Sequence, residues 1–150
     1  MSLTTLNPLL SQKLQIPMWC QKKRILVIEQ EDDLREIFKL SLELVTNWQI
    51  LTASSNAEAL TLTGNQPPLA IVISTSTNNL SDWQVDEQIH HYASTHNIPL
   101  ILMIDRVRLA DQYQCSQQGA AAVVTTPSDP VDFAMNISRI VQRFDWKLSS

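Results

Sequence analysis

A run of four apolar residues, Ile25 to Ile28, constrains the fold of this chain more than any other stretch. The run follows a basic triplet at residues 22–24 and ends abruptly in the acids and the single amide of residues 29–33. A wholly apolar segment of this length, bounded by charge, is typical of a strand buried on both faces of a parallel sheet. The polar groups that follow such a strand lie at the sheet edge where open α/β folds place their chemistry.

The rest of the chain alternates between short apolar runs and segments with helical periodicity. Further strands are predicted at residues 48–53, 69–73, 99–104 and 120–124, and helices at about 33–45, 55–62, 82–95 and 105–118, with a last helix beginning at Pro130. Three helix starts carry capping signatures, which are Asp33 with Glu36, Ser55 with Glu58, and Asp129 before Pro130. Five strands alternating with five helices predict an α/β domain whose parallel sheet is covered on both faces.

The length of 150 residues suits one domain with a sizeable core. Residues 22–145 are predicted to form this domain, and residues 146–150 a short tail. Residues 1–21 form an extension that includes Trp19. Two interpretations of this extension stay open, because its apolar groups could pack on the domain or a partner, or the segment could be disordered.

Charge and composition exclude several classes of protein. A formal net charge of −4 leaves no excess of Lys and Arg to neutralise phosphates, which argues against nucleic acid as the main partner. No segment reaches the roughly 18 apolar residues of a membrane span, and the N-terminus lacks the basic opening of a secretory signal. Cys20 and Cys115 lie far apart, as expected for reduced thiols in a cytoplasmic protein.

From about residue 22 to residue 145 the chain resembles the receiver domains of two-component response regulators, such as the bacterial chemotaxis receiver. The resemblance rests on the order of strands and helices and on the sequence Ile-Leu-Val-Ile after the basic opening. It also rests on Gly119-Ala120 before the fifth strand and on Thr126-Pro127 with Asp129-Pro130 after it. The resemblance implies a flavodoxin-like fold with strand order 2-1-3-4-5, helices on both faces, and a site at the carboxyl ends of strands one, three, four and five.

The resemblance also implies which positions would carry the phosphoryl chemistry of this family. Receivers place an acidic pair after strand one, a phosphate-accepting Asp after strand three, a Thr or Ser after strand four, and a Lys before Pro after strand five. In this chain those positions hold Glu29 with Gln30, Ser74, Ile104 and Thr126. A shift of strand three by one residue would put Thr75 at the acceptor position in place of Ser74, and neither residue is acidic.

These departures remove most of the charge that a magnesium-assisted phosphoryl transfer needs. Mg²⁺ binds several hard oxygen ligands, and Glu29 is a weak candidate because it is the one well-placed carboxylate. A serine nucleophile needs an adjacent general base, and the three histidines, His90, His91 and His96, fall on the third helix or after it. We therefore expect a pseudo-receiver with no catalytic residue, no cofactor and no Mg²⁺. The plainer interpretation of residues 29–33 is a solvated strand end that leads into a capped helix.

The leading hypothesis is a signalling module that has lost the phosphoacceptor Asp and acts through a protein partner, such as a histidine kinase or another response regulator. Receivers signal through the surface of helix four, strand five and helix five. Without phosphate this surface would be held in one state or be biased by a partner, and it could support a homodimer. The sequence offers Arg106, Arg108, Tyr113 and Cys115 as a candidate partner surface.

Two other hypotheses stay open. One is a phosphorelay receiver that uses Ser74 or Thr75 as an unconventional acceptor. The other is a small-molecule sensor with a more apolar pocket around Ile104 and Val27. An NTPase or a dinucleotide-dependent enzyme is disfavoured, because the only glycines are Gly64 and Gly119 and neither phosphate-binding glycine motif can be written.

Overall fold

The computed structural model describes residues 23–64, 67–75, 86–104, 116–117, 119–126 and 129–149. Its elements in chain order are β1 (Arg24–Ile28), α3 (Asp32–Val45), β2 (Gln49–Ala53), α4 (Asn56–Thr63), β3 (Ala70–Thr75), α5 (Glu87–His96), β4 (Leu100–Ile104), β5 (Ala120–Thr125) and α7 (Pro130–Ser149). The helix predicted over residues 105–118 and the extension predicted over residues 1–21 lie outside the described residues, apart from Ser116 and Gln117.

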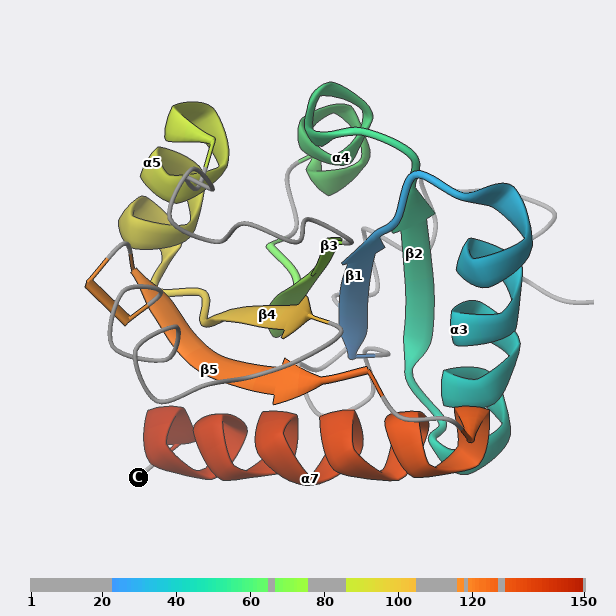
Figure 1. Cartoon of the computed structure of the whole chain (residues 1–150). Helices are drawn as coiled ribbons and strands as arrows, with labels where there is room; N and C mark the ends of the chain where they lie inside the picture. The colour runs from blue at the N-terminus through green and yellow to red at the C-terminus, as the bar shows by residue number, and fades with distance from the viewer. Residues whose placement is uncertain are drawn as a thin grey trace, which may run out of the picture.

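The five strands form one parallel sheet in the order β2-β1-β3-β4-β5, which confirms the predicted topology. Helices α3 and α7 cover one face of the sheet, and α4 and α5 cover the other (Figure 1). A parallel sheet of this kind needs both faces covered, because its crossover connections place helices on each side. In the parts of the chain that the structure describes, no helix is both long enough and apolar enough to cross a membrane.

Strand β1 lies in the interior of the sheet and is buried on both faces. Ile25 and Val27 pack with the cluster formed by α3 and α7, whereas Leu26 and Ile28 pack with α4 and α5. Successive side chains of a strand point to opposite faces, so an apolar run without alternation is what such a position requires. All residues of β4 are buried for the same reason.

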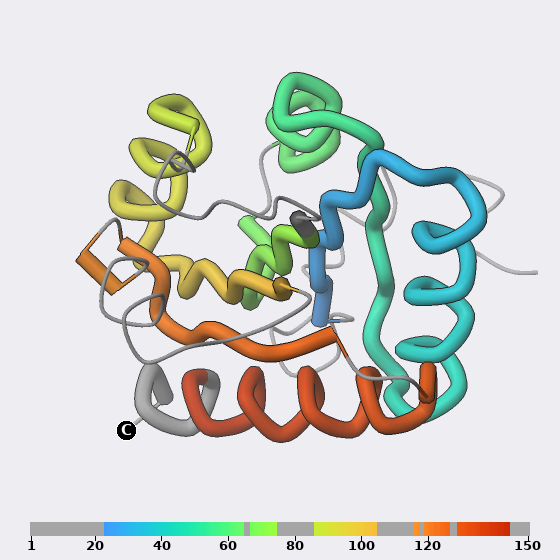
Figure 2. Tube along the Cα trace, in the orientation of Figure 1, coloured from blue at the N-terminus to red at the C-terminus, as the bar shows by residue number. Residues whose placement is uncertain are grey.

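Helices α3 and α7 pack against each other as well as against the sheet. The rings of Phe38 and Phe133 contact each other with their centroids 4.5 Å apart. Leu42, Ile137 and Val141 complete this side of the core, and Figure 2 shows both helices on the same side of the sheet. Helix α7 continues to Ser149, beyond the domain boundary expected at residue 145.

Two of the three predicted helix starts are confirmed. The hydroxyl of Ser55 accepts a hydrogen bond from the backbone N–H of Glu58 at 3.1 Å, which caps α4. The carboxylate of Asp129 accepts from the N–H of Val131 at 2.9 Å, and Pro130 is the first residue of α7. Both caps follow from short-range sequence signals, because the donor and the acceptor are two or three residues apart.

The capping pair predicted for α3, Asp33 with Glu36, is wrong, although the helix starts within one residue of the predicted position. The helix begins at Asp32, its N-cap residue is Glu31, and that side chain makes no capping hydrogen bond. Asp32 instead forms an ion pair with Arg35 one turn further along. Ile37 and Val45 recur with Phe38 and Leu42 at helical spacing, which predicts an inward position for all four side chains, but Ile37 and Val45 are exposed at the surface.

Gly119 provides a test of the contact between α5 and the start of β5. Its φ is +100°, and a β-carbon at this position would stand 2.7 Å from the Cδ2 and Nε2 atoms of His90. We expect Gly119→Ala to lower the free energy of unfolding by about 1–3 kcal/mol, because it combines backbone strain with a steric clash. Chemical denaturation monitored by circular dichroism measures this loss.

The matched control is Gly64→Ala, where φ is +53° and no atom lies within 4 Å of the added β-carbon. Adding His90→Ala should recover part of the loss in the Gly119→Ala background and none in the Gly64→Ala background. An equal effect of His90→Ala in both backgrounds would contradict the described contact.

Candidate functional site

The carboxyl ends of the strands bring the positions singled out from the sequence to one edge of the sheet. Ile28 of β1 stands opposite Ile73 of β3, so Glu29 and Ser74 follow at the same level. The backbone N–H of Glu29 donates to the carbonyl of Ala53 at the end of β2, at 2.9 Å. At the other side of the sheet, the N–H of Thr126 donates to the carbonyl of Ile104 at 2.7 Å.

A pocket of about 740 Å³ opens at this edge above β1, β2 and β3. Its walls come from the end of β1 and the following turn, from the turn between β2 and α4, and from the end of β3. The lining residues are 28–31, Leu34, 54–56, Ile73 and Ser74. Three of the predicted site residues, Glu29, Gln30 and Ser74, therefore line one pocket. Its walls carry carboxylates, hydroxyls and amides, so the pocket is suited to a polar ligand.

Ile104 and Thr126 are not among the residues that line this pocket. The apolar pocket around Ile104 and Val27 stays a prediction, since the residues that follow Ile104 lie outside the described part of the chain. Val27 is buried in the core beneath α3 and α7, and Ile104 is buried with Leu102 and Ala120. Both side chains are needed to fill the core, because strand alternation directs them into the layers that the helices cover.

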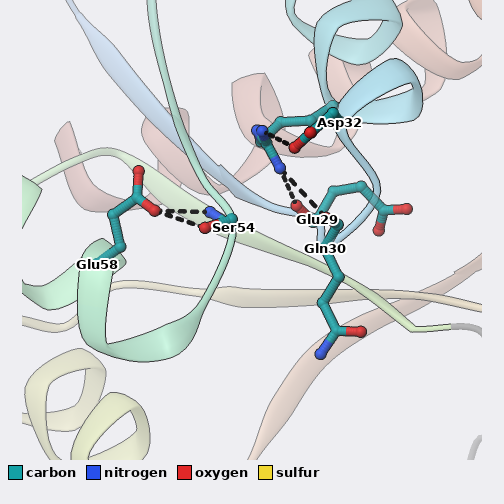
Figure 3. Close-up of polar contacts among 6 residues, drawn as sticks. Glu29, Gln30, Asp32, Ser54 and Glu58 are labelled. Carbon is teal, nitrogen blue, oxygen red and sulfur yellow. Dashed lines mark hydrogen bonds and ion pairs between the residues drawn. The ribbon is translucent and has the colours of Figure 1, made fainter.

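Glu29 is the acid that the fold buries. Only 7% of its surface is exposed. Burial raises the pKa of Glu29 above its ordinary value, and the negative charge of Glu31 acts in the same direction, whereas a hydrogen bond with Ser74 and the positive charge of Arg35 oppose the shift. Figure 3 shows the side chains of Glu29 and Gln30 pointing in different directions, so they do not form a pair of ligands for one ion.

Arg35 has a role at this edge that was not predicted from the sequence. Its guanidinium donates to the carbonyl oxygens of Glu29 at 3.0 Å and of Gln30 at 3.3 Å, and it forms an ion pair with Asp32. These contacts hold the turn between β1 and α3 in one shape. A single Arg on the first turn of a helix after an acidic segment was the only sequence signal for them.

The turn between β2 and α4 was also missed. The carboxylate of Glu58 accepts hydrogen bonds from the backbone N–H of Ser54 at 3.2 Å and from its hydroxyl at 2.6 Å (Figure 3). These bonds hold the pKa of Glu58 below its ordinary value. The receiver positions implied by the resemblance lie after strands one, three, four and five, and none lies after strand two. The residues after β2 reach the pocket because β2 is the neighbour of β1.

We expect the donor set at this edge to bind Mg²⁺ poorly. The receiver positions offer the carboxylate of Glu29, the amide of Gln30 and the hydroxyl of Ser74, and Glu31 adds a second carboxylate to the pocket wall. Burial raises the pKa of Glu29, which works against a charged ligand at that position. Within the described ranges, no three His, Cys, Asp or Glu side chains come together as a metal site.

Other residues that the sequence singled out lie elsewhere. Arg106, Arg108, Tyr113 and Cys115, the candidate partner surface, fall outside the described residues. Thr75 is the last residue of β3 and pairs with Ile104 in the sheet register. The histidines His90, His91 and His96 are on α5 with their surfaces exposed, and none of them lines the pocket.

Comparison with known proteins finds relatives named as transcriptional regulators and a relative named protein PilH. No family model matches it. It is 25% identical over 126 residues to “Probable transcriptional regulator ycf27” of Cyanophora paradoxa, covering 84% of this chain and 51% of that protein. It is 25% identical to the transcriptional regulatory protein KdpE of Mycobacterium tuberculosis over 79% of this chain and 51% of that protein. It is 24% identical to protein PilH of Pseudomonas aeruginosa, with 79% of this chain and 97% of that protein covered. The chain thus spans about half the length of ycf27 and KdpE.

The chain resembles solved structures in its fold, although its sequence identity to them is low. A CheY-like response regulator receiver domain from Methanospirillum hungatei aligns with a TM-score of 0.66 at 17% identity, covering 85% of this chain and 99% of that one. A response regulator receiver domain from Clostridium thermocellum aligns with a TM-score of 0.62 at 21% identity, again covering 85% and 99%. These alignments agree with the sheet order described above.

The buried carboxylate at the pocket makes stability depend on pH in a defined direction. A raised pKa means that the folded chain holds the Glu29 proton more tightly than the unfolded chain, so the contribution of Glu29 to stability is greatest below its ordinary pKa of 4.5 and falls as pH rises through the raised value. We expect Glu29→Gln to be more stable than the natural chain at neutral pH, with the advantage disappearing in acid. Thermal unfolding across a pH series measures the difference.

The exposed acid Glu36 on α3 offers a matched control. Glu36→Gln removes the same charge without removing a buried carboxylate, so its melting temperature should follow that of the natural chain across the pH series. A constant difference between Glu29→Gln and the natural chain from acid to neutral pH would contradict the assignment.

Proposed function

We propose that this chain, which has the fold of response regulator receiver domains, is a receiver-like signalling module that acts without being phosphorylated. The observation that carries the proposal is the composition of the carboxyl edge of the sheet. Glu29 is the one carboxylate there among the receiver positions, and Gln30, Ser74 and Thr126 are neutral where receivers carry two acids and a lysine. The fold is retained while the groups for phosphoryl transfer are missing.

Electrostatics gives the scale of this loss. At an effective dielectric constant of about 20, a unit charge about 4 Å from another contributes about 4 kcal/mol. Replacing carboxylates by Gln30 and Ser74 therefore removes several kcal/mol of attraction for a divalent cation. Replacing a lysine by Thr126 removes the ammonium group that would pair with a phosphoryl oxygen. Burial also raises the pKa of the remaining carboxylate, Glu29, which works against a charged ligand at this position.

A protein partner is the natural target of such a module. The proteins that the chain resembles are named as regulators, and about half of ycf27 and of KdpE lies outside the matched region. We propose that this domain transmits its effect by binding another protein, such as a histidine kinase or another response regulator, and that it has no enzymatic activity of its own. Any effect on transcription would then pass through that partner or through a longer chain.

Two observations support alternatives. The hydrogen bond between Glu29 and Ser74 supplies Ser74 with a neighbouring base, which favours a phosphorelay with Ser74 as the acceptor. The pocket of about 740 Å³ falls in the size range of small-molecule sites, which favours a sensor of a polar ligand. Thermal-shift screening with nucleotides and redox cofactors distinguishes a sensor, whose melting temperature rises with its ligand, from an interaction module, which shows no change.

Restoring the missing charges tests the main proposal. We expect Mg²⁺ with beryllofluoride to leave the melting temperature of the natural chain unchanged, because the receiver positions hold one carboxylate, Glu29, and no lysine. The triple variant Gln30→Asp, Ser74→Asp and Thr126→Lys should gain a Mg²⁺-dependent rise. A ligand present at about 100 times its Kd would stabilise this variant by about 2.7 kcal/mol. Differential scanning fluorimetry measures both.

The matched control carries Asn instead of Asp at position 74, which keeps the size of the side chain and removes its charge. This control should not respond to Mg²⁺ and beryllofluoride. A rise in the melting temperature of the natural chain on addition of Mg²⁺ with beryllofluoride would contradict the proposal. A phosphate adduct on Ser74 or Thr75, found by mass spectrometry after incubation with acetyl phosphate and Mg²⁺, would establish the phosphorelay alternative instead.

A further inference from the structure

Helix α3 exposes a row of large apolar side chains that the fold itself does not use. Ile37, Leu40 and Leu44 all lie at the surface, with Leu40 57% and Leu44 76% exposed. Their spacing of three and four residues places them on one stripe of the helix. The same spacing forms the contact seam of paired helices, so this stripe has the pattern of a helix that packs against another helix.

Helix α7 presents a second apolar strip beside the first. Val131 and Met135, one turn apart, are exposed, and Met135 retains 48% of its surface. A groove of about 390 Å³ connects the two helices, lined by Val45 at the end of α3 and by Met135, Ser138, Arg139 and Gln142 of α7. The two helices contact each other along the same face of the sheet. We call the exposed residues Ile37, Leu40, Leu44, Val131 and Met135, with this groove, the α3–α7 face.

The charges around this face have opposite signs on the two helices. On α3 the exposed acids Glu36 and Glu43 lie along the outer edge of the apolar stripe, on the side turned away from the buried residues Phe38 and Leu42. On α7 the exposed Arg139 and Arg143 follow the apolar strip, and Asp132 is the one acid among the side chains described on this helix and lies nearer its start. The face is therefore acidic on one helix and basic on the other.

A surface of this kind is complementary to itself. In a dimer with two-fold symmetry, α3 of one copy can lie against α7 of the other, and the same contact then forms twice. Each apolar stripe covers the strip of the partner, and each acidic edge meets a basic edge. We propose that the α3–α7 face is the interface of a homodimer. This face differs from the surface of helix four, strand five and helix five through which receivers signal. A homodimer at the α3–α7 face goes beyond the proposed function.

Sedimentation velocity of the full chain over a wide range of concentrations tests the proposal. We expect a reversible equilibrium between monomer and dimer. The variant Leu40→Glu with Leu44→Glu should raise the dimer dissociation constant by about tenfold or more, because it places a charge where each leucine would be buried in the dimer interface. The melting temperature of the monomer should change little, since both side chains are exposed in it.

The matched control is Leu62→Glu on α4, where the leucine is 36% exposed on the opposite face of the sheet. This variant should dimerise like the natural chain. Charge reversal adds a second, independent arm. Glu36→Arg with Glu43→Arg, and separately Arg139→Glu with Arg143→Glu, should each weaken the dimer. The variant that carries all four reversals should regain affinity, because the complementarity is then restored with the signs exchanged.

Three outcomes would overturn the proposal. One is a full chain that stays monomeric at every concentration. In that case, dimerisation of a chain lacking residues 1–22 would identify this segment as the occupant of the face. If the shortened chain also stays monomeric, the occupant would be a different protein. The second is a dimer that survives Leu40→Glu with Leu44→Glu, which would place the interface elsewhere. The third is a four-reversal variant that binds no better than either pair of reversals.

Discussion

The burial of β1 on both faces is the constraint on which the rest of the structure depends. Because helices cover both sides of this strand, each of its residues from Ile25 to Ile28 must be apolar. A polar side chain at any of these four positions would be buried without water. The first acid, Glu29, then comes at the edge of the sheet while still enclosed by neighbouring elements. The position and the protonation behaviour of this carboxylate are both consequences of how the central strand is covered.

The fold of this domain and the phosphoryl chemistry of receiver domains depend on different groups of residues. The sheet order and the helical layers depend on many apolar contacts that are spread through the core, whereas phosphoryl transfer depends on a few charges at the strand ends. Substitution of neutral residues at positions 30, 74 and 126 leaves the apolar contacts intact. A chain can therefore keep this architecture after the charges are gone, and its function must then be argued from its surfaces and its pocket.

Most of the fold could be predicted from the sequence because its signals are local. The apolar runs identify the strands, and Ser55 and Asp129 cap helices only a few residues away. The errors arose where distant segments meet. The start of α3 depends on Arg35, which reaches back to the turn after β1, and the pocket includes Ser54 because β2 lies beside β1. The exposure of Ile37 was not predictable from periodicity, since periodicity defines a stripe but not the width that a neighbouring helix covers.

Arg35 gives the turn after β1 a positive charge that belongs to the chain itself. Because the guanidinium is covalently attached, its place beside the carbonyls of Glu29 and Gln30 does not depend on the binding of a solute. A dissociable ion would occupy this place only in proportion to its free concentration. The two carbonyls of this turn are therefore held by a side chain of the same chain, and a partner that contacts the turn meets a backbone that needs no added ion to fix it.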